Sequence, residues 1–149
     1  MKKLDEILEG VRTVAVAGHV NPDGDCVGSA MGVYLYLRDN FPRIQTDVYL
    51  EGKKKDFAFL PELSIAREEA ESGKSYDLLI LVDVSSADRV AVAGEYVETA
   101  KKTVCIDHHV TNAGFCRENH VVPDASSTCE VLYDLMDEDK ISRDCAMAL

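Results

Sequence analysis

The sequence Thr13-Val14-Ala15-Val16-Ala17-Gly18-His19-Val20-Asn21-Pro22-Asp23-Gly24-Asp25 joins an apolar run to a polar, turn-forming segment. The apolar run predicts a buried β-strand at Thr13 to Ala17. A histidine and two aspartates follow the end of this strand, and Pro22 and Gly24 are turn formers. Beyond this loop, Cys26 to Leu37 is typical of a helix whose small residues allow close approach to a sheet. We therefore predict a strand–loop–helix unit with charged side chains at the carboxyl end of the strand.

The remaining apolar runs indicate a parallel sheet. A first helix is predicted at Leu4 to Val11, and further helices at about Leu63 to Glu71 and Ala87 to Ala100. Buried apolar strands that alternate with helices are typical of a parallel sheet covered on both faces. We expect an α/β fold with an open, mainly parallel sheet of about five strands and helices on both faces. The later strands are expected at residues 46–50, 78–82, 103–106 and 120–122.

Two serine caps predict the last helices. Ser127-Thr128-Cys129-Glu130 has the form of a capping box, and Ser142 precedes an apolar run that reaches Leu149. That run has no glycine stop, so we expect the chain to continue in its parent protein. No linker or repeat marks a boundary within residues 1–149, which predicts one domain.

Composition excludes several classes of protein. The 149 residues carry a net charge of −11, which disfavours duplex DNA or RNA as a partner. No stretch approaches the roughly 18 apolar residues of a membrane span, so we expect a cytoplasmic protein without a membrane partner. The five cysteines include no C-x-x-C pair, which favours reduced thiols over disulfides or structural zinc.

Acids and histidines cluster where the predicted strands end. Because the carboxyl ends of parallel strands share one edge, these side chains are expected to converge. Several adjacent carboxylates repel one another unless cations are present. A mixture of imidazole and carboxylate suits manganese best and leaves iron, cobalt or zinc as alternatives. The residues concerned are His19, Asp23, Asp25, Asp83, Asp107, His108, His109 and Asp124.

Each motif alone has a plainer interpretation. The Asn21 to Asp25 segment could be a turn, and Asp25, Asp83 or Asp124 could serve helix caps. His120 lies away from the predicted edge and is expected to be structural. A turn does not require two later strands to end in acidic motifs, so the combination favours a metal site.

The three motifs together resemble those of the DHH phosphoesterase superfamily. They are His-x-x-Pro-Asp-x-Asp at His19 to Asp25, a lone aspartate at Asp83, and Asp-His-His at Asp107 to His109. Asp88-Arg89 and the segment Ala125 to Glu130 resemble the branch that contains nanoRNases and 3′-phosphoadenosine-5′-phosphate phosphatases.

The resemblance implies a specific division of roles among these residues. One Mn²⁺ would be held by His19, Asp23 and Asp83, and a second by Asp25, Asp83 and His108. Asp83 would be shared between the ions, and Asp83 and His109 would be the catalytic residues. His109 would contact the scissile phosphate, and Asp107 would orient a ligating imidazole.

The implied function is two-metal hydrolysis of short oligoribonucleotides, 3′-phosphoadenosine 5′-phosphate or linear or cyclic dinucleotides. A manganese-dependent inorganic pyrophosphatase and a catalytically incomplete nucleotide- or metal-binding fragment are the alternatives. The family has a fourth aspartate motif and a smaller carboxy-terminal substrate domain beyond a point like Leu149. We therefore expect the isolated chain to be incomplete. The sequence does not decide between a monomer and a homodimer.

Overall fold

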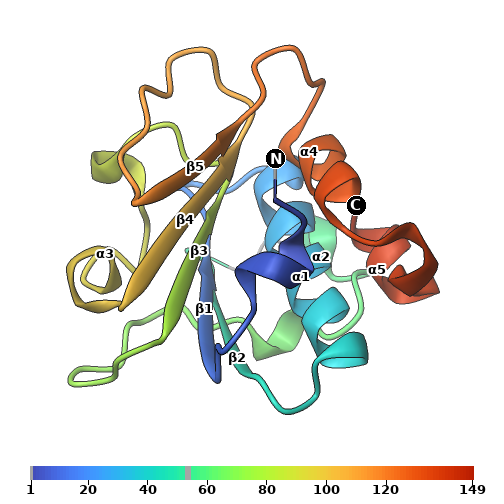
Figure 1. The fold of residues 1–149 in the computed structure, drawn as a ribbon, viewed down its shortest axis with the longest axis horizontal. Coiled ribbons are helices and arrows are strands. Elements are labelled where there is room, and N and C mark those ends of the chain that lie inside the picture. The colour runs from blue at the N-terminus through green and yellow to red at the C-terminus, as the bar shows by residue number, and fades with distance from the viewer. Residues whose placement is uncertain (1, 53–54) are drawn as a thin grey trace.

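The computed structural model describes residues 2–52 and 55–149 and contains a five-stranded sheet in the order β2-β1-β3-β4-β5 (Figure 1). All of its pairings are parallel, which confirms the predicted α/β fold. The bounds predicted for the strands at residues 13–17 and 78–82 are confirmed as well. The strands are β1 (Thr13–Ala17), β2 (Gln45–Tyr49), β3 (Leu78–Val82), β4 (Lys102–Asp107) and β5 (Glu118–Val121).

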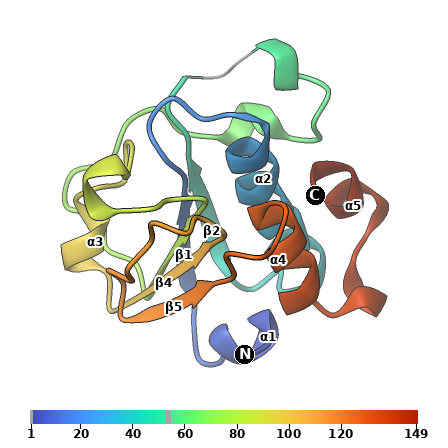
Figure 2. The same cartoon turned by 90° about the horizontal axis from the view of Figure 1, so that it is seen from above.

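Helices lie on one side of the sheet, with the last of them packed on the outside of α2 (Gly24–Asn40) (Figures 1 and 2). The others are α1 (Leu4–Ile7), α4 (Thr128–Leu135) and α5 (Arg143–Ala148). The long helix α2 is central to this layer, because it contacts the sheet on one side and packs against α4 and α5. Val14, Val16, Ile80 and Ile106 point into the apolar core beneath these helices. This core fixes the position of α2, whose first residues belong to the polar loop after β1.

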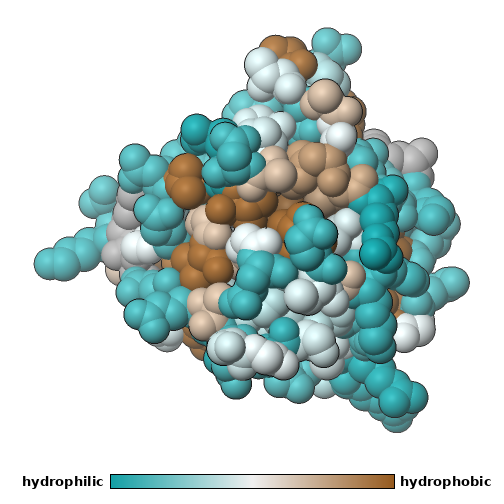
Figure 3. All heavy atoms as spheres, turned by 90° about the vertical axis from the view of Figure 1, so that its left-hand side faces the viewer, coloured by the Kyte–Doolittle hydropathy of each residue, from teal (hydrophilic) through white to brown (hydrophobic). Residues whose placement is uncertain are grey.

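The opposite face is covered mainly by loops and the short helix α3 (Tyr96–Thr99). Its core contains three buried tyrosines whose hydroxyl groups satisfy one another: Tyr49 Oη lies 2.6 Å from Tyr76 Oη and 3.3 Å from Tyr96 Oη. Tyr76 also donates to Asp47 at 2.7 Å. Figure 3 views this side and shows apolar side chains gathered at its centre, surrounded by hydrophilic ones. Helices thus lie on both faces as predicted, but this layer is much thinner.

The helix predicted at Leu63 to Glu71 is wrong. Only a 3₁₀ turn forms there, η2 (Leu63–Ile65), and the chain then extends beside β2. Arg67 donates its backbone N–H to Val48 at 2.7 Å and accepts from Leu50 at 3.0 Å. The acidic residues at 68, 69 and 71 give a helix no apolar face to bury, so bonds to the edge strand prevail.

The helix predicted at Ala87 to Ala100 is interrupted. A 3₁₀ turn, η3 (Ala87–Arg89), is followed by extended backbone at Val90, and only α3 forms at the end of the range. Val90 makes an isolated antiparallel bridge with His19, and Val20 donates to the carbonyl of Arg89 at 2.9 Å. These bonds tie the segment to the polar loop after β1.

The serine caps are confirmed. Ser127 accepts from the backbone N–H of Glu130 at 3.1 Å, and Ser142 accepts from that of Cys145 at 3.2 Å. The capping box is only half formed, because the Glu130 carboxylate accepts from the N–H of Ser126 at 2.8 Å. Two further 3₁₀ turns complete the secondary structure of the described residues, η1 (Lys55–Phe57) and η4 (Glu138–Lys140). Among the described residues, no helix has the length and apolar character needed to cross a membrane.

Replacement of Gly28 by alanine is expected to destabilise the fold. A Cβ atom at Gly28 would overlap the backbone carbonyl oxygen of Ala148 and lie 3.3 Å from Cys129 Sγ. Separating α2 from α5 should lower the free energy of unfolding by about 1–3 kcal/mol. Gly94→Ala is the matched control, because its Cβ would meet only the Ala91 carbonyl oxygen at 3.7 Å. Equal midpoints for the two variants in urea denaturation would contradict close packing at Gly28.

Candidate functional site

The order of the strands places a topological switch point between β1 and β3, at the carboxyl edge of the sheet, where a ligand-binding crevice is expected. The chain passes from β1 through α2 to β2 on one side of β1, and β3 then lies on the other side. In open α/β sheets, ligands bind where the connections diverge in this way. His19 follows β1, Asp83 follows β3, and His108 and His109 follow β4. The sequence motifs are therefore brought to this edge, as expected.

Asp83 is at the centre of the site and is almost completely buried, with 2% exposure. Its backbone has φ 58°, in the left-handed region that non-glycine residues rarely adopt. The peptide N–H of Asp83 donates to the carbonyl of Ile106 at 3.0 Å, and Thr128 Oγ1 donates to Asp83 Oδ1 at 3.0 Å. Burial, together with the nearby charges of Asp25 and Asp23, raises the pKa of Asp83. An ionised Asp83 therefore favours a cation at this position.

His19 presents one ring nitrogen to the carboxylates. Its Nδ1 lies 2.6 Å from the backbone carbonyl oxygen of Val20, which can only accept, so Nδ1 carries the proton in this contact. In the neutral ring, Nε2 then has a free lone pair. Nε2 lies 3.4 Å from Asp83 Oδ2 and 3.7 Å from Asp23 Oδ1.

His108 repeats this arrangement on the other side of Asp83. Its Nδ1 lies 3.2 Å from the carbonyl oxygen of Ala125, which again leaves Nε2 as the free donor atom of the neutral ring. His108 Nε2 lies 3.8 Å from Asp83 Oδ1 and 3.5 Å from Asp25 Oδ2. The two oxygens of Asp83 thus face two different imidazoles.

The two aspartates of the first motif are each held by the start of a helix. Asp23 is the N-cap of α2 and accepts from the N–H of Cys26 at 3.1 Å. Asp25 reaches a different helix, accepting from the N–H groups of Thr128 at 2.8 Å and Cys129 at 3.0 Å. Asp25 therefore does not cap its own helix, since its carboxylate binds the first turn of α4.

His109 is paired with the buried Asp107. His109 Nδ1 donates to Asp107 Oδ1 at 2.7 Å, and Asn112 Nδ2 donates to Asp107 Oδ2 at 2.8 Å. The hydrogen bond to Asp107 raises the pKa of His109. Burial opposes ionisation of Asp107, but the hydrogen bonds from Asn112 and His109 hold its pKa below the ordinary value. Asp107 thus fixes the ring orientation and leaves Nε2 as the other polar atom of His109.

His108 and His109 do not point to opposite sides, as an extended segment would require. Their ring centroids are 4.9 Å apart, and His109 Nδ1 is 3.7 Å from Asp83 Oδ1. The chain leaves β4 after Asp107 and turns, with the N–H of Asn112 bonded to the carbonyl of His109 at 3.1 Å. Both imidazoles therefore reach the same crevice.

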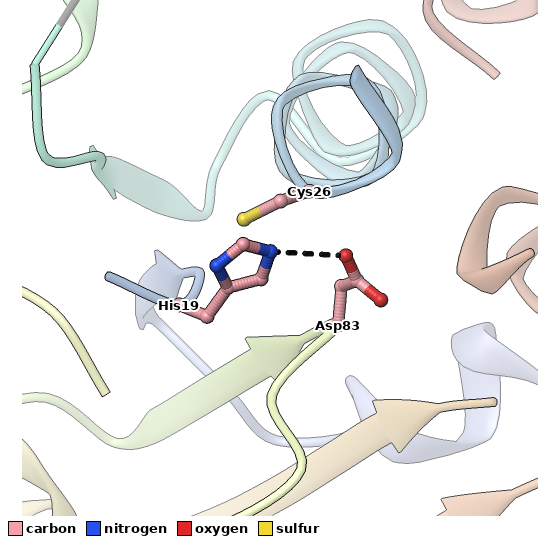
Figure 4. A group of neighbouring side chains, drawn as sticks. All are labelled: His19, Cys26 and Asp83. Carbon is pink, nitrogen blue, oxygen red and sulfur yellow. Dashed lines mark ion pairs between the residues drawn. The ribbon is translucent and has the colours of Figure 1, made fainter. Parts of the chain in front are cut away.

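Cys26 is a further neighbour that the sequence patterns do not single out. Figure 4 shows its thiol, from the first turn of α2, lying beside the His19 ring while Asp83 faces Nε2. Burial raises the pKa of the Cys26 thiol. Among the described residues, two groups have potential metal-ligand atoms within 4.8 Å of one another: His19, Cys26 and Asp83, and Asp83, His108 and His109. Asp23 and Asp25 lie next to these groups.

Other predicted positions lie outside the crevice. His120 is buried within β5 and pairs with Glu118 at 2.9 Å, in line with a structural role. Asp124 is exposed, and its segment contributes the carbonyl of Ala125 instead. Thr128 and Asn112 were missed, because nothing in their local sequence distinguishes them from cap and turn residues. A surface hollow of about 460 Å³ lies beside α1 and α4 and contains none of the site residues.

Comparison with known proteins agrees with the motifs. Residues 13–149 match the family described as "DHH family, N-terminal domain". The chain is 32% identical over 142 residues to "Bifunctional oligoribonuclease and PAP phosphatase NrnA" of Thermus thermophilus, covering 92% of this chain and 40% of that protein. It is 28% identical over 147 residues to "Cyclic-di-AMP phosphodiesterase GdpP" of Bacillus subtilis, covering 90% of this chain and 22% of the relative. The chain thus spans less than half the length of these relatives.

A solved structure shares the fold. The crystal structure of an exopolyphosphatase-related protein from Bacteroides fragilis superposes with a TM-score of 0.82 at 22% identity, over 97% of this chain and 46% of that one. At this identity the likeness concerns the fold alone. The family match covers nearly the whole sequence and includes all three motifs, and the chain therefore belongs to the DHH family.

Proposed function

We propose that this chain supplies the manganese-dependent catalytic centre of a phosphoesterase acting on short oligoribonucleotides, 3′-phosphoadenosine 5′-phosphate or cyclic dinucleotides. The observation that carries the proposal is the position of Asp83 between two imidazoles. Asp83 Oδ2 faces His19 Nε2 at 3.4 Å, and Asp83 Oδ1 faces His108 Nε2 at 3.8 Å. One carboxylate can thereby serve two cations at once.

The donor atoms fit two Mn²⁺ ions. His19, Asp23 and Asp83 would hold one ion, and Asp25, Asp83 and His108 the other. Each imidazole donates its Nδ1 proton to a backbone carbonyl, which is the arrangement that prepares Nε2 as a ligand. Carboxylate and imidazole donors together suit manganese.

The chemistry that fits this centre is hydrolysis of a phosphoester. Two bound divalent cations supply Lewis acidity and positive charge at a phosphoryl group. The chain's own residues orient the site: Thr128 holds Asp83, and Asp107 holds His109. His109 then has Nε2 available to contact a phosphate oxygen, and its raised pKa favours the protonated, hydrogen-bond-donating form.

The substrate class is supported by the relatives and by charge. Several similar relatives are named as oligoribonucleases and PAP phosphatases, and one as a cyclic-di-AMP phosphodiesterase. The net charge of −11 opposes contact with a long nucleic-acid backbone, but a short anion can be met by charge confined to the crevice. Small nucleotides and short single strands therefore fit better than duplexes.

Parallel assays would test the reaction class. The protein is incubated with Mn²⁺ and, separately, an RNA dinucleotide, 3′-phosphoadenosine 5′-phosphate, a cyclic dinucleotide and inorganic pyrophosphate, with products resolved by chromatography. We expect cleavage of at least one nucleotide and loss of that cleavage with a chelator. Turnover of pyrophosphate alone would instead identify a pyrophosphatase. Mn²⁺ binding is measured on the same sample. Binding without turnover would indicate an assembled but inactive centre, and absence of binding would contradict the proposed metal site.

Asp83→Asn should separate metal binding from folding. Removing a buried charge among other carboxylates should raise the thermal midpoint of the metal-free protein, because an asparagine Oδ1 can still accept from Thr128. The same change should weaken Mn²⁺ binding by at least about 100-fold, since even indirect partners of a metal commonly contribute 10–100-fold. Calorimetric titration and thermal unfolding measure the two effects. Asp124→Asn is the control, an exposed carboxylate outside the crevice, and it should change neither.

Asp107→Asn should impair turnover more than metal binding. In Asp107→Asn an amide NH₂ replaces one carboxylate oxygen, so the negative charge is lost and one acceptor oxygen is left for both His109 and Asn112. Because the His109 ring is then held less firmly, we expect the turnover number to fall by about 10–100-fold. Mn²⁺ affinity should stay near that of the unmodified protein, because Asp107 accepts from His109 and Asn112 and not from the proposed ligands. A parallel collapse of Mn²⁺ affinity would show that Asp107 belongs to the metal site itself.

A further inference from the structure

Two cysteines outside the crevice lie together on the thinly covered face of the sheet. Cys105 is fully buried in β4, and Cys116 is partly exposed in the loop before β5. Cys105 belongs to the buried apolar cluster on this face, and Cys116 packs against the same cluster. The proposed phosphoesterase function uses neither residue.

Backbone contacts independently hold Cys116 beside Cys105. Asn119 is the partner of Cys105 in the β4–β5 register. The Asn119 side chain accepts from the N–H of Cys116 at 3.1 Å and donates to its carbonyl at 2.8 Å. Thr103, two residues before Cys105 and on the same face of β4, accepts from the N–H of Arg117 at 3.0 Å. The end of the loop is thereby fixed across Thr103 and Cys105.

The two thiols differ in chemical character. The neighbouring Cys105 and Thr103 side chains lower the pKa of Cys116. The neighbouring Cys116 side chain and burial raise the pKa of Cys105. A partly exposed thiol of lowered pKa beside a buried thiol of raised pKa is the arrangement found where one cysteine reacts with an oxidant and the other resolves the product.

We propose that Cys105 and Cys116 form a reversible, peroxide-sensitive disulfide. The Cys116 sulfur attacks a peroxide oxygen, so that an S–O bond forms, the O–O bond breaks and hydroxide leaves. The Cys105 thiol then loses its proton, its sulfur attacks Cys116, and the S–O bond breaks. In total, two thiols and one hydrogen peroxide give one disulfide and two waters, with two electrons passing from sulfur to peroxide.

The disulfide would alter the hydrogen bonds that position His109. The Cys105 thiol donates to the carbonyl of Val84 at 3.5 Å. The side-chain nitrogen of Asn112, Nδ2, lies 3.5 Å from Cys105 Sγ and 3.1 Å from the same Val84 carbonyl oxygen. The same Asn112 nitrogen donates to Asp107 at 2.8 Å. Oxidation removes the thiol proton and draws the Cys105 sulfur to about 2.05 Å from Cys116, which displaces the contact with Asn112. An effect on catalysis rests on the proposed function, whereas formation of the disulfide does not.

Oxidation followed by peptide mapping tests the bond itself. The reduced protein is treated with hydrogen peroxide, remaining thiols are alkylated, and the digest is analysed by mass spectrometry without reduction. We expect one cross-link between the peptides containing Cys105 and Cys116, reversed by a thiol reductant. Cys116→Ser should abolish it, and Cys145→Ala, which removes a buried thiol elsewhere, should not. Two results would overturn the proposal. One is oxidised Cys116 together with Cys105 recovered as a free thiol that the alkylating reagent has labelled, and the other is a cross-link through Cys26 or Cys129.

Thr103 variants test why Cys116 reacts. Thr103→Val should slow alkylation of Cys116 by about fivefold, the effect of one lost hydrogen bond, and Thr103→Ser should restore the rate. Equal rates in all three proteins would exclude activation by this hydroxyl.

Imidazole NMR tests the connection to the crevice and does not depend on turnover. Oxidation should shift the ring nitrogen resonances of His109 and leave those of His19 unchanged. A disulfide that forms without any shift at His109 would overturn transmission through Asn112 while leaving the proposed phosphoesterase function intact.

Discussion

A buried, shared carboxylate determines how this site is arranged. Asp83 lies at the end of β3, the central strand, and side chains that follow β1 and β4 surround it. Its burial among other acids and its left-handed backbone are both unfavourable in isolation. One hydroxyl and one peptide hydrogen bond offset part of this cost. Bound cations would reverse the local electrostatics, because a buried carboxylate between two positive charges is stabilised by them.

Topology explains why residues from three distant motifs meet. Because β1 connects to β2 on one side and β3 connects to β4 on the other, the connections that leave the carboxyl ends of β1 and β3 diverge beside His19. The loop at His19 is then held from outside the sheet by its bridge to Val90. The segment predicted as a continuous helix is interrupted for this reason, since backbone bonds to the site loop replace helical ones. The departure from local propensity thus supports the geometry of the site.

The sequence was most informative where one physical signal dominated. The strands β1 and β3 were predicted with their bounds, because each is a continuous apolar run followed by Gly18 or Asp83. Charged residues directly after such strands are unusual, which made most of the site visible. Asn112 and Thr128 carried no such signal, because amides and hydroxyls are common in turns and helix caps. The extended chain at Arg67 was missed for a related reason: its partner is an edge strand, which periodicity does not reveal.

The hydrogen bonds at the start of two helices also position two aspartates of the site. Asp23 accepts from the first turn of α2 and Asp25 from the first turn of α4, so the bonds that begin these helices also fix the carboxylates. The partial positive charge of a helix N-terminus favours an ionised acid there. The Asp83 carboxylate instead accepts from the side-chain hydroxyl of Thr128 in α4. Among the described residues, no peptide N–H of α4 donates to it. The negative charge that the fold compensates least is therefore the one placed between the two imidazoles, which is where a pair of cations would be bound most strongly.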